Sequence, residues 1–168
     1  MNTLIRILKH RWLDETDAQR ALGKDGMRHL ETQVAASERT HTGEVRVCVE
    51  AGLPLSYLWR GATARERAIA MFGKLRVWDT EHNNGVLIYL MLAEHRIEIV
   101  ADRGITQRVP AAIWQQISDD MGAAFKAGDY ARGLRGAVDQ VGALLAQHFP
   151  ANPTLVNANE LPDRPDVR

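Results

Sequence analysis

Side chains with the chemistry to bind a cation lie on both sides of the apolar residues 86–101. Asn83 and Asn84 come just before this stretch, and Asp102 and Arg103 come directly after it. Asp79 lies a few residues before Asn83. Carboxylate and amide oxygens are the ligands that Ca²⁺ and Mg²⁺ prefer, and arginine binds phosphate in a two-pronged geometry. These residues therefore predict a calcium or magnesium site made of Asp79, Asn83, Asn84 and Asp102, with Arg103 as a phosphate-binding residue.

A second interpretation of the same residues is an ordinary solvated strand entrance. Asn-Asn-Gly is also a common turn sequence, and no EF-hand loop pattern is present. The geometry of a hairpin decides whether the residues meet. If Ala93 and Glu94 form a two-residue turn, Gly85 lies opposite Asp102 and Asn84 lies across from Arg103. We therefore expect the two polar segments to meet at the open end of the hairpin.

Other kinds of chemistry have weaker support in the sequence. The six histidines are scattered without an H-x-x-x-H pair, so zinc is not favoured, and His82 is either a surface residue or a base tuned by a neighbouring carboxylate. Cys48 is the single cysteine and alternates with valines, which favours a small buried residue over a catalytic thiol. The sequence has no G-x-S-x-G, P-loop or G-x-G-x-x-G motif, which gives no support to nucleophile-elbow hydrolases or nucleotide-binding folds.

Length and charge limit the class of protein. The chain has 168 residues, 45% of them hydrophobic and 25% charged, which fits one globular domain with a sizeable core. Its formal net charge is zero, so we expect no nucleic-acid partner. We also expect no signal peptide and no transmembrane segment, because Arg6, Lys9 and Arg11 interrupt the N-terminal apolar residues. We expect a cytoplasmic protein that is peripheral to a membrane if it meets one.

Two apolar segments are candidates for binding a partner. The N-terminal segment has apolar residues at helical spacing up to Trp12, interleaved with basic residues, and predicts an amphipathic helix. This helix either packs on the domain or a second copy, or rests on an anionic membrane face or a membrane-protein partner. The loop at residues 52–61 carries Leu55, Tyr57 and Trp59 and is either tucked against the core or a partner-binding patch.

The order of expected elements predicts the fold class. Two helices, a strand, a helix, a strand hairpin and two further helices indicate an α/β protein, a three-layer α/β/α sandwich with a small mixed sheet and an additional N-terminal amphipathic helix. We expect an N-terminal helical extension at 1–26, an α/β domain at 27–150 and a flexible, proline-containing tail at 151–168.

Three stretches of the sequence resemble the TPM domain family: "SERTHTGEVRVCVE", "NNGVLIYLML" and "AAFKAGDYARGLRGAVDQVGALLAQHFP". The resemblance covers about residues 27–150, and Phe125, Gly128, Asp129, Tyr130 and Gly133 are its most specific part. It implies an α/β/α sandwich and, in some members, divalent-cation binding near acidic residues together with an acid-phosphatase-like activity. The family includes thylakoid-lumen proteins of photosystem II repair, and this chain is similar to short soluble members often encoded near LemA-type membrane proteins.

Two functional hypotheses follow. The first is a noncatalytic TPM-like binding module that assists a membrane-associated protein assembly or repair system, with a LemA-type membrane protein as the kind of partner that the resemblance implies. The second is a divalent-cation-dependent phosphomonoester hydrolase.

Overall fold

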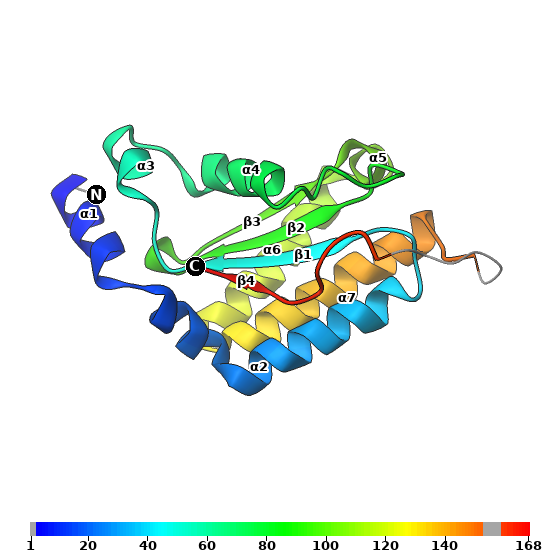
Figure 1. Ribbon diagram of the computed structural model, residues 1–168, viewed down its shortest axis with the longest axis horizontal. Coiled ribbons are helices and arrows are strands. Elements are labelled where there is room, and N and C mark those ends of the chain that lie inside the picture. The colour runs from blue at the N-terminus through cyan, green and yellow to red at the C-terminus, as the bar shows by residue number, and fades with distance from the viewer. Residues whose placement is uncertain (1–2, 153–158) are drawn as a thin grey trace.

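The structure is a computed structural model that describes residues 3–152 and 159–168. Figure 1 shows a sheet with helices on both faces. The helices are α1 (Thr3–Trp12), α2 (Glu15–Glu38), α3 (Leu55–Trp59), α4 (Ala64–Lys74), α5 (Arg103–Thr106), α6 (Ala111–Lys126) and α7 (Tyr130–His148). The strands are β1 (Val45–Glu50), β2 (Val86–Met91), β3 (Arg96–Ala101) and β4 (Asp166–Val167), with a 3₁₀ turn at Leu92–Glu94. The expected three-layer α/β/α class is confirmed.

Within the described residues the sheet has the order β3-β2-β1-β4. The strand β1 pairs in parallel with β2 and with β4, whereas β2 and β3 form an antiparallel hairpin. In the hairpin Val86 lies opposite Ala101 and Met91 opposite Arg96, the register that the turn at residues 93–94 predicts. The central position of β2 agrees with its apolar sequence, because both of its faces are covered and all its residues are buried.

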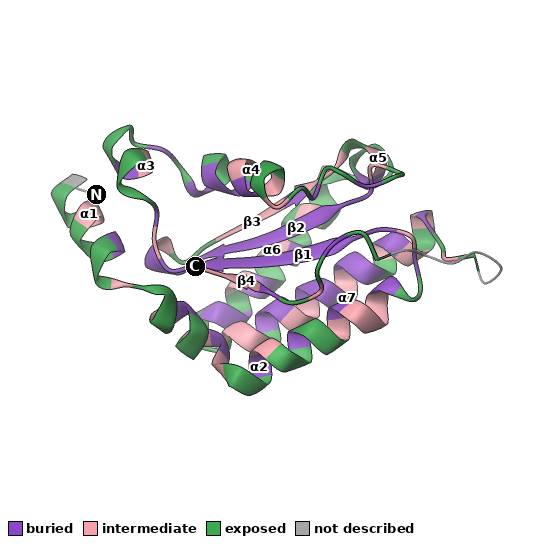
Figure 2. Cartoon of the chain, in the orientation of Figure 1, coloured by how far each residue is buried: buried purple, intermediate pink, exposed green. Residues whose placement is uncertain are grey.

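The two faces of the sheet have separate cores, which Figure 2 shows as buried residues on both sides of the strands. One face packs against α2, α6 and α7 through the side chains of Val47, Ile88 and their alternating neighbours. The other face carries Cys48, Leu87 and Tyr89 and packs against α3 and α4. Strand alternation therefore assigns each residue of β1 and β2 to one of the two layers.

Local sequence signals account for several helix boundaries. Asp14 and Thr63 form capping boxes at the starts of α2 and α4, and Asp129 caps α7 with its side chain. The helix α2 crosses the boundary expected at residue 26 and is kinked at Gly23, whose φ of 68° is a left-handed conformation that favours glycine.

The C-terminal segment differs from the expected flexible tail. Residues 153–158 lie outside the described residues, but beyond them Leu161 is buried and β4 pairs with β1. Arg168 donates its backbone N–H to Val49 O at 3.0 Å, and Glu44 accepts the N–H groups of Glu160 and Leu161 at 3.2 Å. A two-residue strand has no alternation for a sequence pattern to detect, so only its pairing with β1 reveals it.

Candidate functional sites

The open end of the hairpin brings the two polar segments together through their backbones, as the register predicts. Asp102 donates its N–H to Gly85 O at 2.9 Å, and Gly104 donates to Asn83 O at 2.8 Å. The contact is tight, because a Cβ at Gly104 would lie 2.5 Å from the carbonyl oxygens of His82 and Asn83. Asn83 itself has a φ of 51°, a left-handed conformation that asparagine tolerates better than most residues.

The side chains of the predicted metal ligands Asn84 and Asp102 have different surroundings. Asn84 is fully buried, and its Nδ2 donates to Thr42 Oγ1 at 3.3 Å. Asp102 is half-buried and lies at the N-terminus of α5. The structure thus joins the backbones of the two segments, while the two side chains have different partners, Thr42 for Asn84 and the Arg103 N–H for Asp102.

Two acceptor oxygens at this end lack partners. Asn84 Oδ1 and Asp102 Oδ2 are buried without a hydrogen bond in the described part of the chain. The other Asp102 oxygen accepts the N–H of Arg103 at 2.6 Å and so caps α5. Asp79 is exposed and lies 3.7 Å from Arg76, in an ion pair within its own turn. Residues 3–152 and 159–168 contain no group of three or more His, Cys, Asp or Glu side chains arranged to hold a metal ion.

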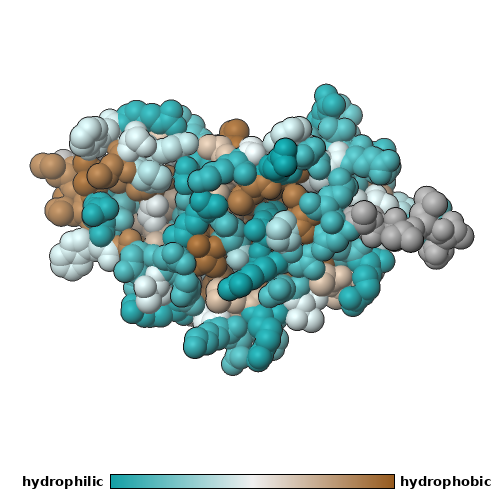
Figure 3. Space-filling model, viewed as in Figure 1, coloured by the Kyte–Doolittle hydropathy of each residue, from teal (hydrophilic) through white to brown (hydrophobic). Residues whose placement is uncertain are grey.

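A second candidate site is the apolar surface at one end of the molecule. Figure 3 shows hydrophobic side chains gathered over α1 and α3. Trp12 is 84% exposed and Trp59 78% exposed, although both are large apolar side chains. We call this set the α1–α3 surface; it consists of Leu4, Ile5, Leu8, Trp12, Leu55 and Trp59. Of the predicted partner-binding residues, only Tyr57 lies outside it, because its ring is half-buried beneath the guanidinium groups of Arg60 and Arg67.

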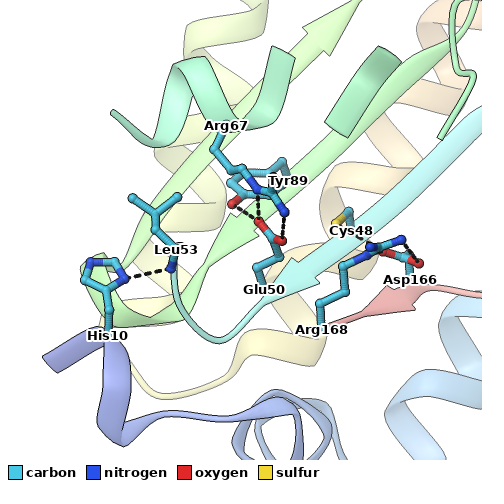
Figure 4. Close-up of polar contacts among 8 residues, drawn as sticks. All are labelled: His10, Cys48, Glu50, Leu53, Arg67, Tyr89, Asp166 and Arg168. Carbon is cyan, nitrogen blue, oxygen red and sulfur yellow. Dashed lines mark hydrogen bonds and ion pairs between the residues drawn. The ribbon is translucent and has the colours of Figure 1, made fainter. Parts of the chain in front are cut away.

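The helix α1 is attached to the domain by polar contacts on its opposite side. Arg6 donates through Nε to Glu94 at 2.7 Å and through Nη2 to Ala62 O at 2.6 Å. His10 accepts the N–H of Leu53 through Nδ1 at 2.9 Å, a contact drawn in Figure 4. Because Nδ1 is an acceptor, Nε2 carries the proton and donates to Glu94 at 3.0 Å. These contacts of Arg6 and His10 are called the α1 latch below.

The charges of the α1 latch are set by burial and by one another. Burial lowers the pKa of His10 below its ordinary value, although the Glu94 carboxylate acts against this shift. Burial by itself would raise the pKa of Glu94, but the hydrogen bonds from Arg6 and His10 hold it below the ordinary value. A neutral His10 and an ionised Glu94 match the hydrogen bonds, so the latch is a set of satisfied contacts.

A buried polar cluster lies between the sheet and α4, and sequence reasoning missed it. Figure 4 shows Arg67 and Tyr89 pointing at the Glu50 carboxylate. Arg67 donates to it through Nε at 2.8 Å and Nη2 at 2.5 Å, and Tyr89 donates its hydroxyl at 2.6 Å. Burial raises the pKa of Tyr89. Because each member is hydrogen-bonded to another, the cluster fastens α4 to β1 and β2.

Cys48 lies on the same face of the sheet and is buried, as its alternation with valines predicts. Its Sγ is 3.6 Å from Asp166 of β4, the contact beside Arg168 in Figure 4. Burial raises the pKa of the Cys48 thiol, so the thiolate that nucleophilic chemistry requires is disfavoured.

Fold and surface together define an α/β sandwich with an externally attached amphipathic helix. The chain belongs to the TPM domain family, since the family model described as the TPM domain matches residues 16–144. Among solved structures, the BA42 protein from the psychrophilic bacterium Bizionia argentinensis is similar, with 26% identity and a TM-score of 0.75 over 86% of this chain and 94% of that one. The N-terminal domain of a P. gingivalis protein shares 19% identity and a TM-score of 0.64, over 83% of this chain and 94% of that one. No curated protein matches the chain.

The described part of the chain contains no helix with the length and apolar character needed to cross a bilayer.

Proposed function

We propose that this protein is a noncatalytic binding module that attaches to a membrane-associated protein assembly through the α1–α3 surface. One observation carries this proposal. The helix α1 contacts the domain through Arg6, His10 and the partly buried Ile7. Its other large apolar side chains, Leu4, Ile5, Leu8 and Trp12, are exposed. An amphipathic helix that only supported the fold would have the reverse orientation, with its apolar stripe on the core.

The energetics of burial support an interaction role. Covering one large apolar side chain contributes about 1.5–3 kcal/mol. The α1–α3 surface exposes several such side chains on two neighbouring helices, including two tryptophans. Contiguous apolar patches on a protein surface mark binding sites more often than chance, because water solvates them poorly.

The test is sedimentation of the purified protein with washed native membranes from its source cells. The Trp12→Ser/Trp59→Ser double variant should lose most of the bound fraction. Trp78→Ser is the matched control, because Trp78 is 50% exposed but follows the far end of α4. The proposal fails if the wild-type protein stays in the supernatant, or if the double variant binds as well as the control.

A cation-dependent phosphomonoester hydrolase is the second candidate function, and the uncommitted Asp102 Oδ2 favours it. Asp102 would hold the cation and the exposed Arg103 would bind the phosphate. Asp79 is in an exposed ion pair with Arg76, whereas Asn84 Oδ1 and Asp102 Oδ2 are buried without a partner in the described residues. A bound divalent cation would supply Lewis-acid activation of the ester.

This second candidate has its own test. Titration with Ca²⁺ and with Mg²⁺, followed by amide NMR, should shift the signals of residues 83–85 and 102–104. Turnover of p-nitrophenyl phosphate should require the cation and fall at least about a hundredfold in Asp102→Asn. Asp79→Asn is the control and should keep its activity. Equal activities of the two variants would rule out this role for Asp102.

A further inference from the structure

A basic cavity borders the α1–α3 surface. It has a volume of about 690 Å³ and lies between α1, the loop that joins α3 to α4, and β3. The residues of its wall with charged side chains are Arg6, Lys9, Arg65, Glu94, Arg96 and Glu98. Cations outnumber carboxylates in this wall, so the cavity attracts anions although the whole chain has a net charge of zero.

Two of these cations are already engaged and two are available. Arg6 is bonded to Glu94, and Arg65 donates to Ile99 O at 2.6 Å beside Glu98 at 3.6 Å. Lys9 and Arg96 are exposed, and neither forms an ion pair within residues 3–152 and 159–168. The cations of the cavity that form no ion pair within the described residues are therefore Lys9, near the end of α1, and Arg96, in the edge strand β3 beside Glu98.

The helix α1 presents this charge beside its apolar stripe. At about 100° per residue, Leu4, Ile5, Leu8 and Trp12 fall within an arc of roughly 100°. Lys9 borders the arc on one side and Arg11 on the other, while Arg6 and His10 point to the domain. A narrow apolar stripe between two cations is the pattern of a helix that lies in the interface of an anionic membrane.

The shape of this end fits a bilayer better than a protein groove. α1 and α3 form a projecting end of the molecule (Figure 1), and the α1 latch fixes α1 against its own domain. A groove on a partner protein could not surround α1, because one side of this helix already contacts its own domain. A lipid surface needs only the outward side. Trp12 and Trp59 suit such a surface, because tryptophan is enriched at the level of lipid headgroups.

We propose that this end of the protein binds an anionic phospholipid bilayer, with the α1–α3 surface in the interface and lipid phosphates in the basic cavity. The proposal rests on the proposed function and names the component of the membrane that the module contacts. Lys9 and Arg96 supply the preference for anionic headgroups, and the apolar residues supply the insertion.

The experiment is flotation with protein-free vesicles. One set contains phosphatidylcholine only, and the other an equal mixture of phosphatidylcholine and phosphatidylglycerol. The wild-type protein and Trp78→Ser should float with the mixed vesicles. Trp12→Ser/Trp59→Ser should bind about tenfold more weakly or worse, because two indoles no longer enter the interface. Lys9→Glu/Arg96→Glu should bind the mixed vesicles no better than pure phosphatidylcholine. Circular dichroism of each variant establishes that it is folded.

Several results would overturn the proposal. Equal binding of the wild-type protein to the two vesicle types would show that the basic cavity does not select anionic headgroups. Binding to native membranes without binding to either vesicle type would leave the proposed function standing and reject the lipid, in favour of a protein component. A dimer in size-exclusion chromatography that Trp12→Ser/Trp59→Ser converts to monomer would identify the occupant as a second copy of the chain.

Discussion

Replacing Arg67 by methionine should destabilise the protein far more than the same change at Arg65. Both residues lie in α4, so the change in helix propensity is the same. The side chain of Arg67 is 10% exposed and that of its partner Glu50 only 3%, and the two share two hydrogen bonds. Arg67→Met leaves the buried Glu50 carboxylate with the Tyr89 hydroxyl as its remaining partner in this cluster. Loss of one member of a buried ion pair costs about 3–5 kcal/mol.

The matched control, Arg65→Met, removes a cation that is 49% exposed. Exposed ion pairs contribute about 0–1 kcal/mol, so its effect should be small. Urea unfolding followed by circular dichroism measures both changes in the free energy of unfolding. For a chain of this length the Arg67→Met loss corresponds to a fall in Tm of about 6–20 °C.

A second variant separates the loss of an ion pair from a general packing defect. Glu50→Gln/Arg67→Met removes the buried charge as well as its partner and keeps an acceptor for Tyr89. It should be at least about 1 kcal/mol more stable than Arg67→Met alone, because no uncompensated charge remains. If Arg67→Met and Arg65→Met have equal effects, or if Glu50→Gln adds further destabilisation, the buried cluster does not stabilise the fold as argued.

Three further predictions concern the α1 latch and the hairpin. Glu94→Ala should increase hydrogen exchange in α1 while the sheet stays protected, since the Glu94 carboxylate accepts hydrogen bonds from both Arg6 and His10. An equal increase of exchange in α1 and in the sheet would contradict a local release of α1. Protection of α1 from hydrogen exchange should be complete above pH 6.5 and decrease as the pH falls below it. Burial lowers the pKa of His10 in the folded protein, and protonation places a donor opposite the Leu53 N–H. Hydrogen exchange that is independent of pH, after correction for the intrinsic rate, would refute this. Gly85→Ala should lower the free energy of unfolding by about 1–3 kcal/mol or more, since its Cβ would lie 2.0 Å from the Val77 carbonyl oxygen. Gly122→Ala in α6 is the control; it has open space around the new Cβ and should be neutral or stabilising. Equal unfolding free energies of the two variants would argue against the close approach at Gly85.

The sequence by itself determined the local features of this protein. The register of the β2–β3 hairpin follows from its turn and from period-two alternation, both of which act between residues close in the chain. The caps at Thr63 and Asp129 are equally local. The apolar spacing up to Trp12 predicted an amphipathic helix, and the apolar loop predicted Leu55 and Trp59 as candidate contact residues.

Only the tertiary structure decided which side of α1 meets the domain. Helical spacing shows that one side is apolar, but the position of Glu94, far away in sequence, brings the polar side inward. The same holds for the partners of Glu50, which lie in α4 and β2, and for β4, which is too short to show a pattern. It also decided the partners of the two side chains at the open end of the hairpin, because Asn84 donates to Thr42, far away in sequence, while Asp102 caps α5.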